Sequence, residues 1–81
     1  MPTLHVLNSI KIDVYSRDHP PPHFHAIYVE HEILIEIKTL KTYTGYLPSR
    51  QHKLVLQWAK EEKVKDFLLQ NFKRLNPNLR S

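Results

Sequence analysis

The sequence predicts an α+β domain in which an antiparallel sheet of about four strands is followed by two C-terminal helices packed on one face of the sheet. Up to residue 48, short segments alternate apolar and polar residues, the period of strands with one buried face. From residue 49 onward, apolar residues recur at the spacing of amphipathic helices. A chain of 81 residues supports one small core, so we expect a single domain over residues 1–81.

The first two strands are expected at Leu4–Leu7 and Ile10–Tyr15. The second of these alternates strictly between apolar and polar residues, and Asn8-Ser9 between the two strands is turn chemistry. The pair is therefore predicted to form a hairpin. His5 lies on the first strand, where we expect it to have a structural role.

A second strand pair is expected at about 23–29 and 32–38, with a loop centred on Glu30-His31. This register forms one wholly apolar face, in which the opposed pairs are Tyr28 with Ile33, Ala26 with Ile35 and Phe24 with Ile37. On the other face it places His25 opposite Glu36, close enough for the carboxylate to orient the imidazole. The alternative is an exposed pair that contributes little.

The remaining chain is predicted to contain an irregular loop and two helices. The loop, Thr39–Pro48, contains the only glycine, Gly45, and a short extended piece at Tyr43–Leu47. Ser49 is the expected N-cap of the first helix. The residues expected to face the sheet are Leu54, Val55, Trp58, Ala59, Val64, Phe67, Leu68, Phe72 and Leu75. Two helices are favoured over one long kinked helix, with an end at Asn76-Pro77-Asn78.

The segment Tyr15–Tyr28 concentrates the residues that can carry chemistry. It holds three of the six histidines, three of the six prolines and the pair Arg17-Asp18. The prolines at 20–22 cannot donate backbone hydrogen bonds and favour a stiff extended arm. The strand period places His23 and His25 on one face, so these two imidazoles and that of His19 can converge.

Two chemistries suit this cluster. In the first, His23 and His25 bind a divalent metal ion, with His19 or Asp18 as the third ligand and a position left open for water. In the second, which needs no cofactor, His23 and His25 act as acid and base in RNA cleavage, with His19 as a substitute for either and Glu36 beside His25. Arg17 and Asp18 are then the candidates for contacting the substrate.

Composition limits the remaining function classes. The chain has no cysteine, which excludes disulfides, thiolate metal sites and a cysteine nucleophile. Its net charge is +4, and the positive excess lies in residues 49–81, which carry eight basic and three acidic residues, whereas residues 1–48 carry four basic and five acidic ones. Arg50 and Lys53 are therefore candidates for attracting RNA. No apolar run approaches the roughly 18 residues that span a bilayer, and we expect a cytoplasmic protein without membrane contact.

A third hypothesis is that the chain catalyses nothing. The proline arm and an edge strand could then bind a partner protein by strand addition, or the basic helices could bind nucleic acid. A second copy of the chain is a further candidate partner, because a domain of this size gains stability from association.

The run Asp18-His19-Pro20-Pro21-Pro22-His23-Phe24-His25, with Gly45-Tyr46-Leu47-Pro48 and a helix carrying Trp58, resembles the small bacterial family called domain of unknown function 4160. The resemblance covers nearly the whole chain. It implies a toxin-like component of a toxin-antitoxin module, whose cognate antitoxin-like partner is a domain of unknown function 2442 protein.

Overall fold

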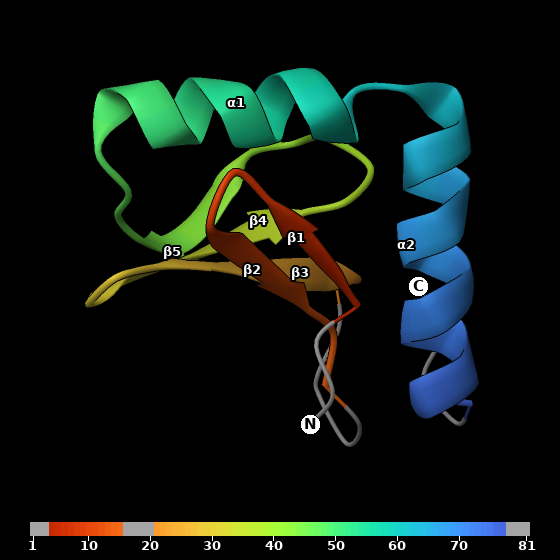
Figure 1. Ribbon diagram of the computed structural model, residues 1–81. Coiled ribbons are helices and arrows are strands. Elements are labelled where there is room, and N and C mark those ends of the chain that lie inside the picture. The colour runs from red at the N-terminus through yellow and green to blue at the C-terminus, as the bar shows by residue number, and fades with distance from the viewer. Residues whose placement is uncertain (1–3, 16–20, 78–81) are drawn as a thin grey trace.

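The computed structural model describes residues 4–15 and 21–77 and shows a five-stranded antiparallel sheet followed by two helices (Figure 1). The strands are β1 (His5–Leu7), β2 (Ile10–Asp13), β3 (His23–Tyr28), β4 (His31–Glu36) and β5 (Thr42–Gly45), and the helices are α1 (Ser49–Ala59) and α2 (Glu62–Leu75). The strands pair in chain order, so β1 and β5 form the two edges. The α+β prediction is confirmed, and the fifth strand is the extended piece of the loop, which pairs with β4.

The first hairpin forms as predicted. Its two-residue turn has positive φ at both Asn8 (47°) and Ser9 (68°), the backbone pattern that matches the twist of the flanking strands. Leu7 lies opposite Ile10, and His5 lies opposite Ile12. The turn therefore places His5 on the same face of the sheet as the buried Ile12.

The predicted register of the second strand pair is wrong by two residues. The turn consists of Val29 and Glu30, so that Tyr28 lies opposite His31 and Phe24 opposite Ile35. Val29 has a φ of 56°, which the sequence gives no reason to expect for a β-branched residue. Because the shift is an even number of residues, the predicted apolar face survives, whereas every partner across the pair changes.

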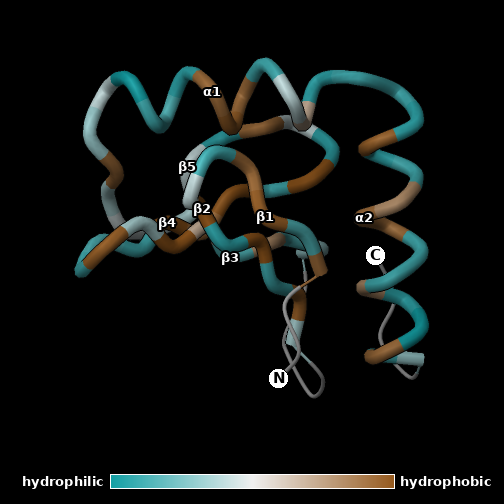
Figure 2. Tube along the Cα trace, in the orientation of Figure 1, coloured by the Kyte–Doolittle hydropathy of each residue, from teal (hydrophilic) through white to brown (hydrophobic). Residues whose placement is uncertain are grey.

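The core lies between the sheet and the two helices. In Figure 1, α1 crosses one face of the sheet and α2 turns down beside it. Figure 2 shows hydrophobic and hydrophilic stretches alternating along both helices, with the hydrophobic stretches of α2 on its side nearer the strands. The buried core residues of the helices are Val55, Ala59, Val64, Leu68 and Phe72. The prediction that Phe67 belongs to this core is wrong, because its side chain is 40% exposed.

Trp58 joins α1 to the first hairpin and to the central strand. Its ring stacks on His5, with centroids 4.8 Å apart and planes inclined by 5°, and it meets Phe24 edge-on at 6.4 Å. Stacked and edge-on arrangements are both favourable for aromatic rings. The contact of His5 with Trp58 agrees with the structural role expected for this histidine.

The helices are separate, as predicted, with Lys60 and Glu61 between them. Ser49 is not the N-cap: Pro48 occupies that position, and Ser49 is the first helical residue. α2 ends before Asn76, whose Nδ2 donates hydrogen bonds to the carbonyl oxygens of Phe72 (3.0 Å) and Tyr15 (2.9 Å). This side chain ties the end of α2 to the chain that leaves β2. Neither described helix combines the length and apolar character needed to cross a membrane.

Candidate functional site

The two histidines of β3 lie together on the sheet face opposite α1. Their ring centroids are 5.3 Å apart. The pleat of the strand alternates them with Phe24 and Ala26, which belong to the core. The sequence prediction that His23 and His25 share one face is therefore confirmed.

His25 is oriented by a carboxylate of the neighbouring strand. Its Nδ1 donates a hydrogen bond of 2.9 Å to Oε2 of Glu32. With the proton on Nδ1, Nε2 is the basic atom of the neutral ring. The imidazole side chain is 9% exposed and that of Glu32 47%, so the pair reaches the surface through its acidic member. The imidazole of His25 also packs against the Tyr15 ring, with the two ring centroids 4.1 Å apart.

The predicted pairing of His25 with Glu36 is wrong. The observed register places Leu34 opposite His25 and Glu36 opposite His23. The Glu36 carboxylate accepts a hydrogen bond of 3.4 Å from the Thr39 hydroxyl in the turn after β4. The strand period did predict a glutamate of β4 on this face. In the observed register Glu32 and Glu36 are both diagonal neighbours of His25, and Glu32 is the one that makes the hydrogen bond.

His23 occupies a buried aromatic environment. It is 1% exposed, and its Nδ1 donates a hydrogen bond of 2.8 Å to the Pro21 carbonyl oxygen. The centroid of its ring lies 5.6 Å from that of the Tyr43 ring on β5 and 5.7 Å from that of the Phe72 ring on α2. His23 therefore packs between the edge strand β5 and helix α2. Its burial makes it less suitable than His25 for proton transfer with a large substrate.

Asp13 is a site residue that the sequence reasoning missed. It lies opposite His25 on β2, is 4% exposed, and its Oδ1 has no hydrogen-bond partner in the described part of the chain. Because directly opposed residues of paired strands share a face of the sheet, the Asp13 carboxylate lies on the same face as the His25 ring. The signal was present, because the alternation of β2 assigns Asp13 to the polar face.

The other predicted site residues do not join this cluster. Arg50 and Lys53 are exposed on α1, which packs on the opposite face of the sheet. Arg17, Asp18 and His19 lie outside the described residues. Within residues 4–15 and 21–77, no three His, Cys, Asp or Glu side chains are placed to hold a metal ion.

The fold and the site define a small α+β protein with a carboxylate-oriented histidine on the sheet face opposite α1. Residues 9–73 match the model of the family described as domain of unknown function (DUF4160), and the chain belongs to this family. The family resemblance seen in the sequence is thereby confirmed. Neither the curated proteins nor the solved structures contain a match.

Proposed function

We propose that this protein is the toxin-like member of a bacterial toxin-antitoxin module and that it cleaves RNA with His25 as the general base. The observation that carries this proposal is the hydrogen bond of 2.9 Å between His25 Nδ1 and the Glu32 carboxylate. A carboxylate in this position holds the ring in one tautomer and in one orientation, as a general-base histidine requires.

The chemistry is transfer of the phosphoryl group to the neighbouring 2′-oxygen. Nε2 of His25 takes the proton of the ribose 2′-hydroxyl, and the resulting oxygen nucleophile attacks the adjacent phosphorus. The bond from phosphorus to the 5′-oxygen breaks, and a general acid protonates that oxygen, leaving a 2′,3′-cyclic phosphate and a 5′-hydroxyl. We assign the acid to His19 and phosphate binding to Arg17 on sequence grounds, because both residue types suit these roles.

A non-catalytic binding module is the second candidate. The low exposure of His23 (1%) and His25 (7%) favours it, because buried imidazoles serve packing as readily as chemistry. In this alternative the cluster holds β5 and α2 in place, and binding takes place elsewhere on the surface.

The chain offers a matched pair of variants for testing the catalytic proposal. Glu32→Gln and Glu36→Gln make the same chemical change on the same strand, but only Glu32 contacts His25. With purified protein and a fluorescent RNA in the presence of EDTA, we expect Glu32→Gln to slow cleavage about 10- to 100-fold. Glu36→Gln should cleave at the parental rate, and His25→Asn should lose about 100-fold or more.

Growth and RNA integrity after induction of the protein alone complete this test. We expect the parent and Glu36→Gln to arrest growth and degrade RNA, and His25→Asn to do neither, provided that its circular dichroism remains native. Growth arrest without RNA loss would retain the toxin and reject the nuclease. If neither purified parent nor induced cells show RNA cleavage or growth arrest, the binding module replaces the proposal.

A further inference from the structure

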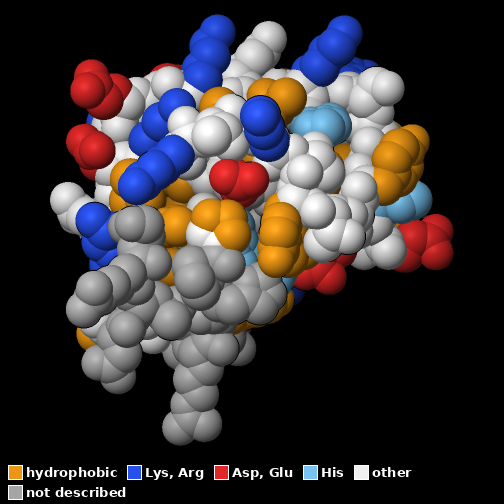
Figure 3. Space-filling model, turned by 180° about the vertical axis from the view of Figure 1, so that it is seen from behind, with side chains coloured by type: hydrophobic (Ala, Val, Ile, Leu, Met, Phe, Trp, Pro, Cys, Tyr) orange, Lys and Arg blue, Asp and Glu red, His pale blue; other side chains and the backbone are white. Residues whose placement is uncertain are grey.

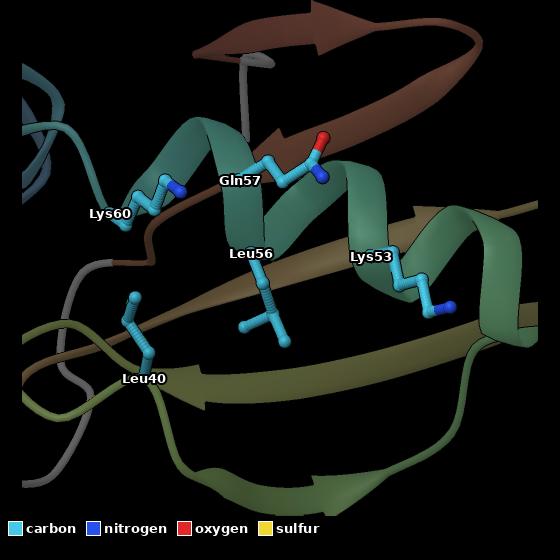
Figure 4. A pocket seen from close by; sticks show the side chains of 5 residues that line it. All are labelled: Leu40, Lys53, Leu56, Gln57 and Lys60. Carbon is cyan, nitrogen blue, oxygen red and sulfur yellow. The ribbon is translucent and has the colours of Figure 1, made fainter.

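A hollow lies between α1 and the turn that follows β4. It has a volume of about 330 Å³ and is lined by Leu40, Lys53, Leu56, Gln57 and Lys60. Figure 4 shows Leu40 and Leu56 extending into the space between the helix and the strands, with Lys53 and Lys60 on either side of Leu56 and Leu40 below Lys60. The hollow therefore has an aliphatic floor and a cationic rim.

The rim is positively charged because of helix periodicity. One side of α1 carries Lys53 and Leu56, and the C-cap residue Lys60 continues that side. A separation of seven residues places the two lysines about 10 Å apart along the helix axis. Both lysines are exposed, as is Lys41, which follows Leu40 directly. Figure 3, the view from behind, shows Lys and Arg side chains over the upper part of the molecule, with hydrophobic surface and some Asp or Glu side chains among them. Among the described residues, no carboxylate belongs to the lining of the hollow.

The backbone of Leu40 helps to form this hollow. Its φ is 63°, in the left-handed region that costs a branched residue about 1–2 kcal/mol compared with glycine. Leu40 and Leu56 both pack against the core but remain only half-buried, so core packing accounts for part of their contacts. The surface that remains accessible can bury a further apolar side chain.

The lining favours a peptide over a nucleic acid. Nucleobases bind to proteins by stacking on aromatic or guanidinium planes, and the described residues of this lining include neither. An aliphatic floor suits an aliphatic or aromatic side chain of a partner, and two separated ammonium groups suit carboxylates on each side of that residue.

We propose that this hollow docks an acidic peptide segment of a partner protein, with one apolar side chain between Leu40 and Leu56 and carboxylates at Lys53 and Lys60. The binding surface lies on the α1 side of the sheet, whereas His25 lies on the opposite side. The proposal thus goes beyond the proposed function, and either one can fail without the other.

A peptide selection tests this specificity directly. A display library of random 16-residue peptides is selected on the immobilised full chain, and the best peptide is synthesised and titrated by fluorescence anisotropy. We expect enrichment of sequences in which a large apolar residue is flanked by Asp or Glu. Lys53→Glu/Lys60→Glu should weaken binding at least 10-fold, as should Leu56→Gln. The matched control is Lys63→Glu/Lys73→Glu, which makes the same charge change at exposed positions of α2 and should bind within twofold of the parent.

Three results would overturn the proposal. They are failure to enrich any peptide, enrichment of peptides without acidic residues, and equal weakening by the two double variants. Amide chemical shifts of the parent locate the site independently: the selected peptide should shift Leu40 and Leu56. If a 12-nucleotide single-stranded RNA shifts these amides and displaces the peptide, the hollow is a nucleic-acid site.

Discussion

Gly45→Ala is expected to destabilise the protein by about 2–4 kcal/mol, a large effect for the addition of one methyl group. Gly45 has a φ of 93°, where alanine is strained. A Cβ at this position would also overlap the carbonyl oxygen of Glu32 and lie 2.9 Å from Cα of Ile33. Both contacts are backbone atoms of β4, which cannot rotate away. Unfolding in urea, followed by circular dichroism, measures the change.

Thr44→Ala is the matched control for this prediction. Thr44 precedes Gly45 on the same edge strand and is exposed, so its substitution should change the free energy of unfolding by no more than about 0.5 kcal/mol. Equal midpoints of urea unfolding for Gly45→Ala and Thr44→Ala would show that a Cβ at position 45 does not clash with the backbone of Glu32. If the protein cleaves RNA as proposed, Gly45→Ala should also slow that cleavage, because it displaces the residue that orients His25.

Alternation along the strands predicted which side chains share a face, because this depends only on the pleat. It predicted the apolar face of β3 and β4, and the common face of His23 and His25, without any knowledge of the turn. The register depends on the turn, and the turn uses Val29 with a positive φ. Since a β-branched residue is a poor candidate for that conformation, sequence patterns directed the loop to Glu30-His31 instead.

The errors at the candidate site have two sources. They are the turn at Val29 and Glu30, which sets the register, and the contribution of β2 to the site. The two-residue shift places Leu34 opposite His25 and leaves Glu32 and Glu36 as its two diagonal neighbours, of which Glu32 makes the hydrogen bond. Asp13 lies outside the segment Tyr15–Tyr28 in which the sequence concentrates its histidines, although pairing of β2 with β3 places Asp13 opposite His25. The hollow at Leu40 and Leu56 was beyond prediction, because it combines a helix with a turn whose backbone conformation the sequence does not reveal.

Phe24→Ala is expected to cost about 3–5 kcal/mol, the range observed when a large buried aromatic side chain is truncated. Phe24 is completely buried on the central strand and packs edge-on against Trp58. A domain of this size has a total stability of about 4–12 kcal/mol, so this one change can unfold much of the population. Urea unfolding should be followed by circular dichroism, because Trp58 fluorescence would also report the lost ring contact.

Phe67→Ala provides the same truncation at a position where helix periodicity also predicted a core residue. The Phe67 side chain is 40% exposed, so we expect its truncation to cost less than about 1 kcal/mol. The difference between the two variants thus measures how closely α2 packs on the sheet at each position. Equal losses of stability would mean that Phe67 is buried in solution, which would require α2 to be rotated from its position in Figure 1 and would separate Phe72 from His23.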